Sequence, residues 1–348
     1  MSTKRDRSRS VAKGRALGDD DVVWAATQHH VYRQPIAKLA ARLRVGPSYL
    51  RHRLFETRPA PEGGTGGSRP LWELKIVDLR NSHERREASG ALRGKYGLKG
   101  AVVLRVPEEA WDGKEPARTT ALVQVACEAA QYLDQELRRL TKPVLMVGQG
   151  YTTSLVARVI EPGERLRDLK VVAAVGVTGP RPSPTEANAI AAVLADAYRG
   201  TCVRMPISVF WPSGEAPALA QLPVLREPFR NLRDAQVALV GVGVCAKGSW
   251  LREAIRAHGL QEADVCPENY CGDITGFFFD SSLNAVTGPY CALGVGLEPL
   301  KQMVRQAKSV IAVNAVDERR VDALRAALAG GLINVLITDD HTAARLVA

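Results

Sequence analysis

Short apolar runs alternate with amphipathic segments along most of this chain. Val144–Val147 is typical, because four apolar residues in succession precede a segment with apolar positions at helical spacing. Such runs indicate buried strands, and the helical spacing indicates helices that cover them. This alternation predicts a doubly wound, Rossmann-like α/β domain with a largely parallel sheet. The expected strands span 71–79, 101–106, 144–147, 170–177, 202–205, 236–244, 309–313 and 334–338, and the expected helices span 83–96, 120–140, 186–198, 318–329 and the residues from 340.

Residues 1–58 follow a different pattern, of three short helical segments. Asp19–Asp21 is expected to cap a helix that begins near Val22. A second helix is expected over 36–43, and Pro47 predicts the start of a third after a tight turn. Apolar residues of the last two helices and their turn are spaced as the shared core of a helix-turn-helix: Ile36, Leu39, Leu43, Val45, Leu50 and Leu54.

The third helix, 47–55, has the composition of a recognition helix. Its leucines face inward, so the outer face is short, basic and rich in hydrogen-bonding side chains, as in proteins that read the DNA major groove. An ordinary three-helix cap is the alternative interpretation, because helix-turn-helix patterns are weak in sequence. The residues expected to contact DNA are Ser48, Tyr49, Arg51, His52 and Arg53.

The positive charge is concentrated in the same part of the chain. Residues 1–58 hold 13 Lys and Arg against 5 Asp and Glu, whereas the remaining residues hold 34 against 32. A local concentration of this kind indicates a polyanionic partner for that segment, here double-stranded DNA, although a solvated basic tail would have the same charge.

Composition also predicts the domain boundaries. Residues 1–18 are polar and basic without periodicity, so we expect a disordered arm ahead of a helix-turn-helix domain over 19–58. Residues 59–70 are rich in Gly and Pro and are expected to form a flexible linker. The rest, 71–348, is expected to form the α/β domain.

A glycine turn at 148–150 is the clearest candidate ligand site. It joins the apolar run at 144–147 to a helical segment that opens with Thr152 and Thr153. Backbone N–H groups at such a turn can hold an anion at the start of a helix. A simple strand-to-helix connection capped by one of these threonines is the alternative. Ligands of doubly wound sheets bind at the carboxyl ends of the strands, where this turn is expected to lie.

Other classes of protein are disfavoured. The six cysteines form no CxxC pair and have no histidine partners nearby, so we expect free thiols in a reducing cytoplasm, no metal and no cofactor. No apolar run approaches the roughly 20 residues that span a membrane. The N-terminal residues also lack the apolar core of a secretory signal.

Three motifs identify a known family. They are GQGYTT at Gly148–Thr153, CGDITGFFFD at Cys271–Asp280 and GGLINVLITDDHTAARLVA at Gly330–Ala348. With them the chain resembles the SorC/DeoR-type bacterial transcriptional regulators. These proteins join an N-terminal helix-turn-helix to a sugar-binding effector domain of the NagB/RpiA/CoA-transferase-like fold.

The resemblance implies a homodimer or homotetramer that binds an operator and a phosphorylated sugar or related effector. It also implies that residues 71–348 are a sugar-phosphate-type effector-binding and oligomerisation domain. By position it implies that the glycine turn contacts phosphate and that Asp273 binds a sugar hydroxyl. Three places depart from the family pattern: the segment at 175–177 lacks an Asn-Gly-Gly, Arg320 stands nearest to the usual lysine, and Cys291 stands where an arginine is common. The residues expected to bind the effector are Gly148, Gln149, Gly150, Thr152, Thr153, Gly176, Asp273 and Arg320.

Three functions are therefore weighed. The favoured one is a DNA-binding regulator whose operator affinity depends on the effector. A regulator with a degenerate effector domain used only for assembly is the second, motivated by the departures from the family pattern, among them Cys291 in place of an arginine. The third, a sugar-phosphate isomerase or deaminase, is disfavoured because Asp273 has no evident acid–base partner. We expect no enzyme activity.

Overall fold

The computed structural model describes residues 17–30, 34–55, 57–58, 69–70, 85–162 and 164–348. The chain divides into two units, Met1–Asp78 and Leu79–Ala348. The expected strand at 71–79, nearly all of the expected disordered arm and most of the expected linker lie outside the described residues.

Three helices form the first unit, α1 (Asp19–His30), α2 (Ile36–Leu43) and α3 (Pro47–Phe55). Helix α1 begins before the predicted Val22, and the Asp21 carboxylate accepts the Gly18 N–H at 3.1 Å. The predicted core is confirmed, since Leu39, Leu50 and Leu54 are buried and Ile36, Leu43 and Val45 pack against them. Trp24 of α1 belongs to the same core, so all three helices contribute to it.

A short antiparallel pair follows these helices. Strand β1 (Thr57–Arg58) pairs with β2 (Arg69–Pro70). The two strands flank the segment 59–68 in the sequence, and both belong to the first unit, so the expected linker at 59–70 does not coincide with the boundary between the units.

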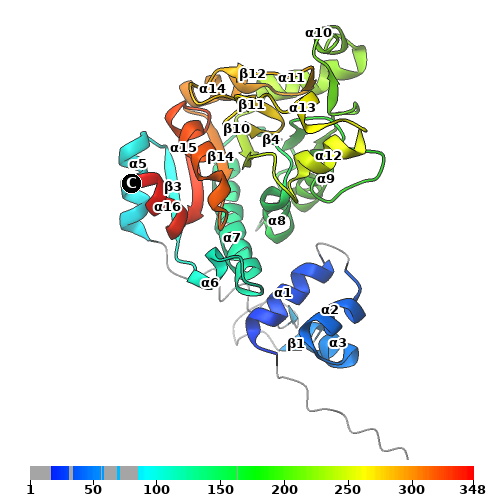
Figure 1. Cartoon of the computed structure of the whole chain (residues 1–348), viewed down its shortest axis with the longest axis vertical. Coiled ribbons are helices and arrows are strands. Elements are labelled where there is room, and N and C mark those ends of the chain that lie inside the picture. Colours follow the sequence, from blue (N-terminus) through cyan, green and yellow to red (C-terminus); the bar gives the residue numbers. More distant parts are fainter. Residues whose placement is uncertain (1–16, 31–33, 56, 59–68, 71–84, 163) are drawn as a thin grey trace, which may run out of the picture. The chain divides into compact units, whose positions relative to one another are not determined.

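A parallel sheet of seven strands is the frame of the second unit (Figure 1). The described strands lie in the order β3-β15-β14-β8-β4-β5-β6, and every neighbouring pair is parallel. The predicted α/β fold with a parallel sheet is therefore confirmed. The strands are β3 (Gly100–Leu104), β4 (Val144–Val147), β5 (Lys170–Ala173), β6 (Thr201–Val203), β8 (Val237–Val240), β14 (Ser309–Val313) and β15 (Val335–Asp339).

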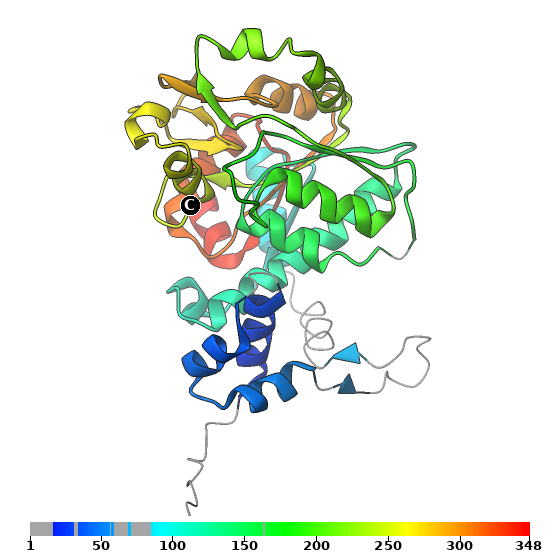
Figure 2. The same cartoon turned by 90° about the vertical axis from the view of Figure 1, so that its right-hand side faces the viewer.

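Amphipathic helices cover this sheet (Figures 1 and 2). Helix α7 packs along α8, and α8 along α9, whereas α11 packs against β4 and β5, and α5 against α16 and β3. The helices are α5 (Arg86–Tyr96), α6 (Glu108–Trp111), α7 (Ala117–Arg138), α8 (Tyr151–Val159), α9 (Ala187–Tyr198), α10 (Ala216–Leu219), α11 (Arg226–Asp234), α12 (Trp250–Ala257), α13 (Glu262–Val265), α14 (Leu297–Arg305), α15 (Val321–Ala329) and α16 (Asp340–Val347), with 3₁₀ turns η1 (Pro223–Leu225) and η2 (Glu318–Arg320). No helix of the described residues is long and apolar enough to cross a membrane.

The strand order reverses between β4 and β8. From β4 the chain proceeds to β5 and β6 on one side, and from β8 it proceeds to β14 and β15 on the other. Two neighbouring strands whose chains leave in opposite directions open a crevice at their carboxyl ends, which is where doubly wound proteins bind ligands.

A second, antiparallel sheet stands beside this crevice. The predicted strand over 236–244 is in fact interrupted: β8 ends at Val240, and β9 (Val242–Gly243) pairs with β10 (Gly272–Ile274) instead of continuing the main sheet. The apolar patch at 271–280 is a hairpin of β10 and β11 (Phe277–Phe279), turned by two residues with positive φ, at 275 and 276. Strand β12 (Ala285–Val286) completes this sheet, and β13 (Tyr290–Ala292) pairs separately with β7 (Phe210–Pro212).

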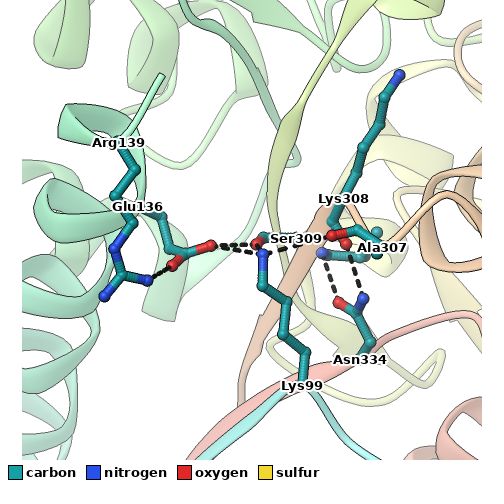
Figure 3. Close-up of polar contacts among 8 residues, drawn as sticks. Lys99, Glu136, Arg139, Ala307, Lys308, Ser309 and Asn334 are labelled. Carbon is teal, nitrogen blue, oxygen red and sulfur yellow. Dashed lines mark hydrogen bonds and ion pairs between the residues drawn. The ribbon is translucent and has the colours of Figure 1, made fainter.

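A polar network around the buried Glu136 links α7 to residues at the amino ends of β3 and β14 (Figure 3). Glu136 accepts hydrogen bonds from Lys99 at 2.9 Å, from Arg139 at 2.5 Å and from the Ser309 hydroxyl. Burial would raise the pKa of Glu136, but the hydrogen bonds from Ser309 and Lys99 and the nearby charges of Lys99 and Arg139 lower it. Asn334 secures β14 by accepting the Val310 N–H at 2.8 Å.

Candidate functional site

A cleft lies at the carboxyl ends of β4 and β8, where the strand order reverses. Its cavity volume is about 50 Å³, and it is partly open to solvent. One wall is the start of α8, and the opposite wall is β9 with the hairpin that carries Asp273. The residues that line it are Gln149, Gly150, Tyr151, Thr152, Thr153, Gly241, Val242, Gly243, Val244, Gly248, Ser249, Trp250, Asp273 and Arg320.

The start of α8 is built to present backbone N–H groups to this cleft. Gly150 is its N-cap with a φ of 136°, and no side chain caps the helix. The interpretation of the turn as a threonine-capped connection is therefore wrong: the Thr153 hydroxyl instead donates to the Gly150 carbonyl at 2.9 Å. The first N–H groups of a helix have no acceptor within it, and the helix dipole adds positive charge there. This end of the cleft therefore suits an anion.

Gln149 and Asp273 bring unsatisfied polar atoms to the cleft. Gln149 is 3% exposed and Asp273 is 1% exposed. Within the described part of the chain, both amide atoms of Gln149 and the Oδ1 of Asp273 have no hydrogen-bond partner. A buried polar atom without a partner costs about 1–3 kcal/mol. Such a cost is recovered when a ligand supplies the missing hydrogen bonds.

Asp273 and Arg320 both line the cleft, and the charge of each affects the pKa of the other. Burial raises the pKa of Asp273 to about 6. The Gly276 N–H, which donates to Asp273 Oδ2 at 3.0 Å, and the charge of Arg320 both oppose this rise. Burial lowers the pKa of Arg320, opposed by the carboxylates of Asp317 and Asp273. The Arg320 Nε lies 3.1 Å from the Asp317 carboxylate, which anchors the guanidinium while 28% of its side chain stays exposed. Arg320 is thus a fixed cation at the cleft.

Two of the predicted effector residues do not line the cleft. Gly148 donates to the Leu239 carbonyl at 2.8 Å, and a Cβ there would lie 2.5 Å from the Thr275 methyl. Gly176 lies beside the loop at 207–208, where a Cβ would be 2.2 Å from the Ile207 carbonyl. Both glycines permit close backbone packing, and neither is placed to contact a ligand in this cleft. The other predicted residues are all in its lining.

The opposite wall contains residues that the sequence did not single out as a site. Gly241 and Gly243 fall within the predicted strand at 236–244, and the sequence around Trp250 carries no signal of a site. Gly243 leaves the room that Asp273 occupies, because a Cβ there would lie 2.6 Å from its Oδ1. Ser249 caps α12 by accepting the Arg252 N–H at 3.2 Å, which places Trp250 at the cleft.

The predicted DNA-contact residues lie on one helix of the first unit. Ser48, Arg51 and His52 are exposed on α3, while Leu50 and Leu54 are buried beneath them. Tyr49 is 40% exposed, and its hydroxyl accepts the Leu17 N–H at 3.4 Å. Arg53 is partly buried. A metal site was not expected, and no cluster of three or more potential metal ligands occurs among the described residues.

The fold resembles those of solved bacterial regulators. The full-length sorbitol operon regulator SorC of Klebsiella pneumoniae superposes with a TM-score of 0.61 at 19% identity, covering 95% of this chain and 100% of that one. The probable sor operon regulator of Shigella flexneri gives 0.62 at 22% identity over 76% of this chain and 99% of that one. A DeoR family regulator from Listeria monocytogenes gives 0.63 at 21% identity, with coverages of 75% and 98%.

Sequence comparison leads to the same group. The deoxyribonucleoside regulator of Bacillus subtilis is 23% identical over 280 residues, which are 79% of this chain and 83% of that protein. The family described as "Sugar-bind: Putative sugar-binding domain" matches residues 81–348, the whole α/β domain. These findings confirm the resemblance to SorC/DeoR-type regulators, and the chain belongs to this sugar-binding domain family.

Proposed function

We propose that this protein is a DNA-binding transcriptional regulator whose operator affinity is controlled by a small phosphorylated sugar-like effector. The observation that carries the effector half is the set of buried, unpartnered polar atoms of Gln149 and Asp273 beside the uncapped start of α8. The relatives described above are named as regulators, which supports the same function and disfavours an enzyme.

The cleft offers two kinds of recognition. The start of α8 and Arg320 suit a phosphate, since a guanidinium can hold two phosphate oxygens at once. Asp273 and Gln149 suit hydroxyl groups, because a carboxylate accepts O–H bonds and an amide both donates and accepts. A phosphorylated polyol carries both features in one molecule. A neutral sugar would leave the anion-binding wall unused.

The effector half can be tested by thermal shift or calorimetry against a panel of phosphorylated sugars and their unphosphorylated counterparts. We expect binding of at least one phosphorylated compound, and loss of that binding in Gln149→Leu, which removes both amide atoms at similar volume. Absence of binding across the panel would favour the alternative, a regulator that uses its α/β domain only for assembly.

The DNA half depends on the exposed face of α3. The exposure of its basic side chains supports a recognition helix, and we propose Arg51 and His52 for base edges and Ser48 and Tyr49 for phosphates. We propose a homodimer or homotetramer, because helix-turn-helix proteins read paired half-sites. A cytoplasmic location follows from the same proposal.

Genome-wide footprinting of the bound protein would yield the operator for a direct test. Arg51→Ala should weaken operator binding by more than about tenfold, the loss of one good base contact, without a change in oligomeric state. Lys38→Ala, on the exposed surface of α2, is the matched control for loss of one positive charge. Equal effects of the two variants would contradict the assignment of α3 as the recognition helix.

A further inference from the structure

A groove lies between α5 and α16 on the outer side of the α/β domain. The two helices pack against each other and both contact the edge strand β3 (Figure 1). The groove has a cavity volume of about 600 Å³ and shares no lining residue with the cleft described above. Small apolar side chains form much of its lining: Ala88, Ala91, Ala343, Ala344 and Val347.

The chemistry of this groove suits a protein surface. Among the described residues, the buried polar atoms without a hydrogen-bond partner all lie outside it, unlike those of Gln149 and Asp273 in the cleft. A small polar ligand would therefore find few groups to hold it here. A groove of apolar side chains between two helices is instead the shape that accepts a third helix.

Two glycines in the interior of α5 have no role within the folded chain. A Cβ at Gly90 or at Gly94 would meet no atom within 4 Å. Glycine is less favourable than alanine in a helix interior, so open space around both positions leaves their small size unexplained. The distance between two packed helices depends on the side chains at their contact. The glycines therefore leave a helix face that a second helix can approach closely.

The same side of the domain is closed to pairing between strands. Strand β3 is at the edge of the parallel sheet, where unpaired backbone groups invite another chain. The Val103 N–H, however, donates to Ser89 Oγ at 3.1 Å, and the Val103 carbonyl accepts the Arg85 N–H at 2.7 Å. The start of α5 thus occupies the outward groups of Val103, and a partner on this side must dock on the helices.

We propose that α5 of a second copy of this chain lies antiparallel in the groove between α5 and α16, with a twofold axis at Ala91. Glu87, Ala88, Ala91, Gly94 and Lys95 are three, four or seven positions apart, so they share one face of α5. The axis places each position opposite the one equally far beyond Ala91. Ala88 then faces Gly94 of the second copy, and Glu87 faces Lys95 of the second copy.

The charges at the ends of the groove match this arrangement. Glu87 lines one end, and Lys95 is at the other, where its Nζ donates to the Val347 carbonyl at 2.8 Å. Both side chains are exposed. At the Glu87 end, Arg85 is already paired with Asp340 at 3.8 Å. An antiparallel copy brings a base to the acidic residue and an acid to the basic one, whereas a parallel copy would bring like charges together.

Charge exchange tests this contact by sedimentation velocity of the full-length protein without DNA or effector. Glu87→Lys and Lys95→Glu should each weaken self-association about tenfold, because the axis turns one substitution into two like-charged pairs. A mixture of the two variants should recover the wild-type association, since every lysine then faces a glutamate. Glu253→Lys, the same change of charge on the exposed surface of α12, is the control and should associate as the wild type does.

Ala91→Cys provides a second measurement at the axis itself. Helices with small residues at their contact approach to about 8 Å between axes, which is close enough for a disulfide between the two copies. After mild oxidation, peptide mapping should find position 91 linked to position 91 of the second copy. Ala257→Cys, at an exposed alanine of α12, should give no such link to itself.

The interface rests on the proposed function only in its expectation of a homo-oligomer. Self-association that neither charge variant weakens would overturn the interface alone, and so would a mixture that does not recover it. A wild type that stays monomeric at every concentration would overturn both the interface and the proposed homo-oligomer. The mixture and the cross-link measure a gain of contact, which a misfolded variant would not produce.

Discussion

Asp273 should destabilise the folded protein at neutral pH, and Asp273→Asn should therefore stabilise it. Burial raises the pKa of this carboxyl from 3.8 to about 6. Each unit of pKa shift corresponds to 1.36 kcal/mol, so the ionised side chain costs the folded state about 3 kcal/mol above pH 6. The amide of an asparagine has no charge to desolvate, and its oxygen can still accept the Gly276 N–H.

The sign of the pH dependence follows from the raised pKa. Below pH 3.8 the carboxyl is protonated in both the folded and the unfolded states, so no cost exists. Between pH 3.8 and about 6 the unfolded state releases the proton first, and the cost grows to its full value. The free-energy difference between Asp273→Asn and the wild type should thus increase from near zero at pH 4 to about 3 kcal/mol at pH 7.

Urea unfolding of both proteins at several pH values measures this difference, and the titration of other groups cancels between them. A variant that is less stable than the wild type at pH 7 would refute the reasoning. So would a stability difference that stays constant from pH 4 to pH 7. The same variant should bind the effector more weakly, since an ionised carboxylate accepts hydrogen bonds more strongly than an amide does.

Three further variants probe separate features of the structure. Glu136→Gln should lower the free energy of unfolding by about 1–3 kcal/mol at pH 7 in urea unfolding, because Lys99 and Arg139 lose their carboxylate partner. Since the pKa of Glu136 is lowered in the folded protein, this loss of stability should shrink as the pH falls below 4.5. A loss of stability that does not change with pH would contradict this reasoning. Gly176→Ala should lower the free energy of unfolding by about 1–3 kcal/mol through overpacking. At Gly214 a Cβ meets no atom within 4 Å, so Gly214→Ala should change it by less than about 0.5 kcal/mol. Equal Tm values of the two variants would count against the close packing at Gly176. Arg320→Ala should weaken the binding of inorganic phosphate about tenfold in calorimetry. Arg319→Ala is the control, because Arg319 is also a partner of Asp317 but lies outside the cleft lining. Its phosphate affinity should stay within about twofold of that of the wild type.

The sequence predicted the parallel sheet well because its strands are apolar on both faces. Val237–Val240 and Ser309–Val313 are fully buried, and continuous apolar runs are typical of strands covered by helices on each side. The small antiparallel sheet was not resolved by the same reasoning. Its strands are only two or three residues long, too short for an alternation of two residues to become visible.

The residue pattern predicted one side of the candidate cleft, and the family resemblance supplied Asp273 and Arg320. Gln149 to Thr153 follow a strong strand-turn-helix pattern, so their place at a carboxyl edge could be inferred. The opposite wall depends on where β9 leaves the main sheet and on the cap of α12 by Ser249, and both are tertiary events. Glycines gave a mixed result, because the sequence alone does not distinguish a glycine that admits a ligand from one that admits a neighbouring backbone, as at Gly176.

The division of the cleft between two sheets has a mechanical consequence. The helix that offers its N–H groups is attached to β4 of the parallel sheet, whereas Asp273 belongs to the antiparallel one. The chain passes from β8 of the first sheet to β9 of the second through Gly241 alone. A ligand bound to both walls would connect the two sheets and reduce their relative motion. The ligand would then determine the distance between the two sheets. Helices attached to either sheet would move when this distance changes.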